Sequence, residues 1–137
     1  MRELPSIVEM VGWRMMKHPD RTAYVFLADG ERETDRLTFR QLEQRSRAVA
    51  ALLQQHGERG DRILLVYAPG LDFVIGFLAC LYAGMVAVPV YPPDPVRMQK
   101  TLPRFRAIVT DASCTHALTT ADILPVAQAL GADAPEI

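Results

Sequence analysis

The chain has 137 residues, half of them hydrophobic, with a formal net charge of −1. This composition predicts one soluble globular domain, and it argues against nucleic-acid binding because basic residues are interspersed with acidic ones, as in Glu31-Arg32-Glu33. Two cysteines, Cys80 and Cys114, and an N-terminus without a signal-peptide pattern predict a reduced, cytoplasmic protein.

Residues 1–60 predict a helix, a β-hairpin and a long helix. Ser6 and Glu9 have the spacing of a capping box, and the helix that they open should end near His18. Asp29-Gly30 is a hairpin turn signal between strands at 23–27 and 31–37, of which the second is polar and should be an exposed edge. The residues expected on the inward face of the first helix are Ile7, Met10, Val11 and Met15.

A second capping box, Thr38 with Gln41, opens the long helix, which should run from Phe39 to about His56 and stop at Gly57. Its apolar positions recur at helical spacing, so one face should pack on the core. That face comprises Phe39, Leu42, Val49, Leu52 and Leu53.

Residues 61–95 predict a central βαβ unit, around which the rest of the chain is arranged. Arg62 to Tyr67 reads as a strand buried on both faces, and Asp72 to Ala83 as a helix that Gly84 terminates. Met85 to Val90 is a second strand, and the prolines of Tyr91 to Pro95 stop it because proline cannot donate to a strand ladder. Two such strands around one helix should be parallel.

The uncharged run Phe73 to Pro93 is long enough to be read as a membrane span. Gly84 and Pro89 interrupt it at the spacing of a helix followed by a strand, and no basic cluster flanks it. We therefore expect a buried helix and strand and no transmembrane segment.

Residues 96–137 predict a helix, a strand and a helix. The first helix should run from Met98 to about Asp111, with Pro103 in its first turn because proline is tolerated there. A short strand should cover His116 to Thr119, and a last helix should begin at Thr120 or Ala121 and close at Gly131. The alternation after residue 61 predicts a layered α/β domain with a parallel βαβ core.

Several of these segments resemble one family. Leu37-Thr38-Phe39, the helix end Cys80 to Gly84, the strand Val86 to Val90 and above all Tyr91-Pro92-Pro93 are similar to the N-terminal part of a fatty acyl-AMP ligase, a branch of the adenylate-forming superfamily. The resemblance covers about Ile7 to Ala121, so residues 1–137 would be the first part of the large N-terminal adenylation domain.

The resemblance implies an enzyme that uses ATP and Mg to convert a fatty acid into acyl-adenylate, for transfer to an acyl carrier protein in lipid, polyketide or lipopeptide metabolism. The family's phosphate loop, magnesium-binding acid and catalytic lysine lie beyond the matched part. We therefore assign no catalytic residue, expect no cofactor on this segment and predict that it is inactive alone.

Candidate substrate-binding residues are Tyr91, Pro92, Pro93 and Asp94, because open parallel sheets bind ligands beyond the carboxyl ends of their strands. The alternative is that this loop is a rigid connector that turns the chain onto the next helix. The chain has no Gly/Ser/Thr-rich loop with a lysine, and Asp72 would repel a phosphate at the next helix. The three histidines are far apart in the sequence, which predicts no metal site.

Three alternatives stay open from the sequence. The parent could be an acyl-CoA synthetase or an amino-acid adenylation domain, which differ in acceptor and acid. The chain could also be an α/β interaction module without catalysis.

Overall fold

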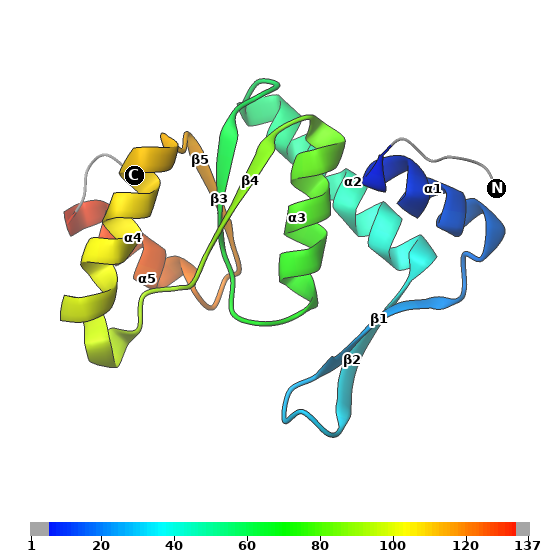
Figure 1. Ribbon diagram of the computed structural model, residues 1–137, viewed down its shortest axis with the longest axis horizontal. Helices are drawn as coiled ribbons and strands as arrows, with labels where there is room; N and C mark the ends of the chain where they lie inside the picture. Colours follow the sequence, from blue (N-terminus) through cyan, green and yellow to red (C-terminus); the bar gives the residue numbers. More distant parts are fainter. Residues whose placement is uncertain (1–5, 134–137) are drawn as a thin grey trace.

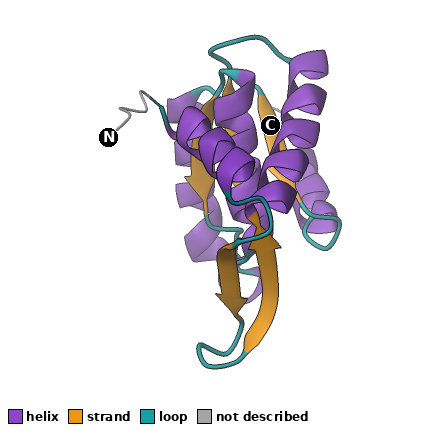
Figure 2. Cartoon of the chain, turned by 90° about the vertical axis from the view of Figure 1, so that its right-hand side faces the viewer, coloured by secondary structure: helices purple, strands orange, loops and turns teal. Residues whose placement is uncertain are grey.

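The computed structural model describes residues 6–133 and contains two sheets and five α-helices in that range. Helices cover both faces of a three-stranded sheet, and a separate hairpin projects from one end (Figures 1 and 2). The elements are α1 (Ile7–Lys17), β1 (Thr22–Leu27), β2 (Glu33–Thr38), α2 (Phe39–His56), β3 (Arg62–Val66), α3 (Leu71–Ala83), β4 (Val86–Val90), the 3-10 helix η1 (Pro95–Arg97), α4 (Met98–Ala112), β5 (His116–Thr119) and α5 (Leu124–Asp133).

The predicted βαβ unit is confirmed. β3 and β4 pair in parallel, with Arg62 opposite Val86 and Val66 opposite Val90, and α3 connects them. Gly84 ends α3 in the left-handed region, at φ 74°, where its N–H donates to helical carbonyls. β5 pairs in parallel with the other side of β3, so the strand order is β4-β3-β5.

The central strand separates two layers of helices (Figure 1). Successive side chains of a strand point to opposite faces, and all four residues from Ile63 to Val66 are buried. Ile63 and Leu65 belong to a cluster with α2 and α3, whereas Leu64 and Val66 belong to one with α4. β3 is thus buried on both faces, as its apolar run predicts.

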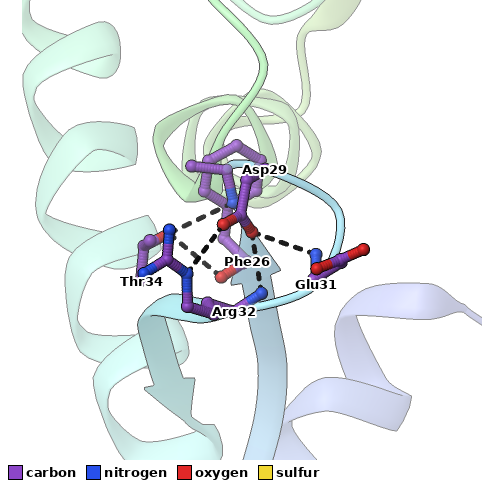
Figure 3. A network of polar contacts seen from close by, with 6 residues as sticks. Phe26, Asp29, Glu31, Arg32 and Thr34 are labelled. Carbon is purple, nitrogen blue, oxygen red and sulfur yellow. Dashed lines mark hydrogen bonds and ion pairs between the residues drawn. The ribbon is translucent and has the colours of Figure 1, made fainter.

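The prediction that the second hairpin strand is an exposed edge is confirmed, whereas the turn differs from the prediction. β1 and β2 pair only with each other, so both strands are edges, and the first four residues of β2 are exposed. The turn is longer than Asp29-Gly30, because the Asp29 carboxylate accepts hydrogen bonds from the backbone N–H groups of Glu31 and Arg32, 3.0 and 2.7 Å away (Figure 3). These backbone bonds, and then the Arg32 side chain, lower the pKa of Asp29 to about 2.

The capping box at Thr38 is confirmed, the one at Ser6 is only partly formed because the Glu9 carboxylate accepts from the Ser6 hydroxyl, and two predicted faces need correction. Thr38 and Gln41 form a reciprocal capping box, and the Ser6 hydroxyl accepts from the Glu9 N–H. In α2, Leu53 is buried, whereas Leu52 was wrongly placed inward and is 50% exposed. In α1, Val11 is the buried residue, and Ile7 and Met10, also predicted inward, are exposed. A short helix on the outside of α2 and α3 buries a narrow stripe, so half of the expected face is left in solvent.

The last third of the described chain shows two further corrections. Pro103 lies in the second turn of α4, not the first, and its exposed position lets the helix continue without that backbone donor. α5 begins at Leu124, later than predicted, because residues 120–123 form a turn in which the Thr120 carbonyl accepts from the N–H groups of Ile123 and Leu124. Gly131 was expected to close this helix and instead lies within its bounds.

Within residues 6–133, no helix combines the length and apolar character that a membrane crossing requires. The run Phe73 to Pro93 is divided between α3, β4 and the loop after β4, as the positions of Gly84 and Pro89 predict. Pro89 stands in an edge strand, where a missing donor disrupts no interior pairing.

Candidate functional site

A groove lies at the carboxyl ends of β3 and β4, where they meet the start of α3. It has a volume of about 330 Å³, and we call it the edge groove. Its lining residues are Tyr67, Ala68, Pro69, Gly70, Phe73, Pro89, Val90 and Tyr91.

The sheet geometry creates this groove. Val66 and Val90 are opposite each other in the parallel pair, so the segments that follow them leave the sheet side by side. Residues 68–70 carry one segment into α3, and the other turns away through the proline-rich loop. From the far side, the Thr119 hydroxyl donates to the Val66 carbonyl at 2.8 Å, which fixes the end of the central strand.

Two aromatic side chains form walls of the groove, and α3 supports each of them. Tyr67 is half-buried, and its ring lies close against Gly76 of α3. Phe73, in the first turn of α3, packs against Phe77 with ring centroids 6.2 Å apart. Sequence reasoning missed both walls, although they follow the strand end and open the helix that the βαβ pattern predicts.

The groove is suited to an uncharged, apolar ligand. None of its lining residues is a lysine, arginine or histidine. Burial, and then the negative charge of Asp72 and the Cys80 thiol, raise the pKa of Tyr67 to about 12, so its hydroxyl is neutral at physiological pH. A polyanionic triphosphate has no cationic partner among these residues.

The structure separates the four predicted site residues. Tyr91 lines the edge groove and is 87% exposed, whereas Pro92 is half-buried and Pro93 is buried. The Asp94 carboxylate accepts from the Val96 N–H at 2.9 Å and caps η1, and the Asp94 N–H donates to the Thr101 hydroxyl. These bonds orient the loop, and substrate binding by the four residues stays a prediction.

The described residues contain neither a metal-binding cluster nor an activated cysteine nucleophile. Among residues 6–133, no three His, Cys, Asp or Glu side chains are grouped so that they could hold a metal ion. Burial raises the pKa of the Cys80 thiol to about 11 and also raises that of Cys114, so neither is an activated nucleophile.

Two curated relatives illustrate what the chain is similar to. It is 41% identical over 117 residues to a medium-chain-fatty-acid–[acyl-carrier-protein] ligase of Moorena producens, covering 85% of this chain and 20% of that protein. It is 36% identical to the human Disco-interacting protein 2 homolog A, covering 87% of this chain and 8% of that one. It thus spans about a fifth or less of the length of these relatives.

Solved structures agree with the sequence relatives. A fatty acyl-adenylate ligase from Legionella pneumophila, in complex with acyl adenylate and pyrophosphate, matches with a TM-score of 0.81 and 39% identity over 90% of this chain and 21% of that one. This likeness confirms the α/β fold and the resemblance to fatty acyl-AMP ligases. The model of the family described as AMP-binding enzyme matches residues 11–136, and the chain therefore belongs to the AMP-binding enzyme family.

Proposed function

We propose that the chain is the N-terminal segment of a ligase that joins a fatty acid to the AMP of ATP, releasing pyrophosphate, and passes the acyl group to an acyl carrier protein. The observation that carries the proposal is the edge groove, an apolar groove at the carboxyl edge of a parallel sheet, where ligands of such sheets bind. The 41% identity to an acyl-carrier-protein ligase supports a fatty acid as the substrate.

In this proposal, the edge groove binds the alkyl part of the fatty acid. Its walls are aromatic and aliphatic, so contact with an alkyl chain removes apolar surface from water on both sides at roughly 25 cal/mol per Å². Tyr91 supplies an exposed ring at the mouth, which a ligand can cover without disturbing the core. Pro92, Pro93 and Asp94 restrict the backbone of the loop that carries this ring.

ATP and Mg would be bound by other parts of the complete protein. The described residues do not fit them, because the groove has no cationic side chain and residues 6–133 contain no metal-binding group of acids. The segment's own task is to supply a rigid wall for the acyl chain. We further propose a cytoplasmic location and a role in polyketide or lipopeptide biosynthesis, which free cysteines and a carrier-protein ligase relative support.

The coding sequence after the codon for Ile137 tests this proposal. We expect the reading frame to continue into a Gly/Ser/Thr-rich loop that ends in a lysine, because triphosphate binding needs backbone N–H groups and a cation. A stop codon directly after Ile137 would contradict the proposal and favour a non-catalytic interaction module.

A further inference from the structure

We propose that Gly76 is a specificity-determining position, which sets the width of the edge groove by letting Tyr67 lie back against α3. This inference rests on the proposed function, since it assigns the groove to an acyl chain. It adds a residue that lies behind the groove wall and is absent from its lining.

The contact between Gly76 and Tyr67 is closer than any side chain would permit. A Cβ placed on Gly76 would lie 2.8 Å from the Tyr67 Cε2 atom, 2.9 Å from its hydroxyl oxygen and 3.1 Å from Cζ. Carbon atoms pack at about 3.5–4.0 Å, so even alanine would displace the ring. Tyr67 can occupy its present position only because residue 76 is glycine.

Backbone conformation does not explain this glycine. Gly76 lies inside α3 with ordinary helical geometry, where glycine costs about 1 kcal/mol relative to alanine. Gly12, inside α1, is different, because a Cβ there would meet nothing within 4 Å. The helix tolerates Gly76 at a cost in stability, and the space that it leaves is filled by the Tyr67 ring.

A ring displaced by a side chain at position 76 has to move away from α3. α3 cannot retreat, because Ile75 and Ala79, the helical neighbours of Gly76, are buried in two core clusters and close packing resists such a shift. Tyr67 itself lines the edge groove, so a ring displaced from Gly76 changes the shape of that groove. A larger residue at 76 therefore pushes the ring into the groove and narrows it.

The test compares Gly76→Ala with Gly12→Ala in the complete protein, using a series of saturated fatty acids from short to long chain. Adenylate formation is followed as pyrophosphate release, and melting temperatures report on folding. We expect Gly76→Ala to lower kcat/KM about tenfold for the longest acids that the wild type accepts, equivalent to roughly 1.4 kcal/mol, and to leave the shortest unchanged. Gly12→Ala should leave the whole profile unchanged.

A second variant, Tyr67→Leu, tests the same inference in a protein that keeps Gly76, so the result does not depend on whether Gly76→Ala folds. Tyr67→Leu removes the ring, so it should restore long-chain activity in the Gly76→Ala background and extend the profile of the wild type. An unchanged profile in Gly76→Ala, an equal loss for all chain lengths, or no effect of Tyr67→Leu would overturn the inference while leaving the proposed function intact. A wild-type protein that activates no fatty acid would overturn both.

Discussion

Substitution of the exposed Tyr91 can test ligand binding without disturbing the fold. Its ring lines the edge groove and is 87% exposed, so it contributes to a ligand site without supporting the core. We predict that Tyr91→Ala in the complete protein raises the KM for fatty acids several-fold, in line with a loss of about 1–1.5 kcal/mol of contact, and leaves the melting temperature unchanged.

Val96→Ala is the matched control, because Val96 is 91% exposed and is not among the lining residues of the groove. Val96→Ala should change neither the KM for fatty acids nor the melting temperature. Equal KM values for the wild type, Tyr91→Ala and Val96→Ala would remove the proline-rich loop from the substrate site.

The half-buried Tyr67 hydroxyl and the buried Cys80 thiol make the stability of the fold sensitive to high pH. Burial raises the pKa of Tyr67 from 10.0 to about 12 and that of Cys80 from 9.0 to about 11. The unfolded chain therefore loses these protons first, and stability, fully present below pH 9, falls as the pH rises toward 12. Urea midpoints measured across this range should decline, and less steeply between pH 10 and 12 in Tyr67→Phe. Identical curves for the two proteins would show that Tyr67 is solvated.

At the scale of single elements, adjacent leucines of α2 give a direct test of how the helix packs. Leu53 is 5% exposed and belongs to the cluster under α3, whereas Leu52 is 50% exposed. Both changes to alanine have the same helix propensity, so burial decides the difference. We predict that Leu53→Ala lowers the free energy of unfolding by about 2–5 kcal/mol and Leu52→Ala by at most about 0.5 kcal/mol, measured by urea denaturation. Equal losses would mean that the helix is rotated from its position here.

The features that the sequence predicts well are determined by residues close together in the chain. The Thr38 and Gln41 capping box and the left-handed Gly84 act within one turn of chain, and the structure shows them in place. Burial at Leu52 and Ile7 was not predictable in this way, because it depends on how much of each helix a distant partner covers. Pro103 illustrates the same limit, since an exposed position lets proline stand in a second turn.

The structure has a groove at the edge where the sequence predicts a ligand site, but most of the residues that line it were not predicted, and ligand binding there stays a prediction. The rule that ligands bind beyond the carboxyl ends of parallel strands led to the loop at Tyr91, and the groove is at that edge. Tyr67 and Phe73 could be identified as walls of the groove only from the packing of α3, which brings the end of a strand and the start of a helix together. The role of Asp94 as the cap of η1 also depends on the observed turn.

At the scale of the whole molecule, the proposed function assigns the fold of the described residues and the chemistry on ATP to different parts of the protein. Residues 6–133 build a layered sheet whose central strand is buried on both faces and whose carboxyl edge carries an apolar groove. The chain covers 20% of a carrier-protein ligase to which it is 41% identical. We infer that this part positions the acyl chain and that the remainder of the enzyme supplies the groups that act on ATP.

Adenylate formation by the complete protein tests this account most directly. The purified protein would be incubated with ATP, Mg and either a fatty acid or a set of amino acids, and products would be identified by mass spectrometry. The account predicts acyl-AMP and pyrophosphate that depend on the fatty acid. Aminoacyl-AMP in place of acyl-AMP, or no adenylate with any acid, would contradict it.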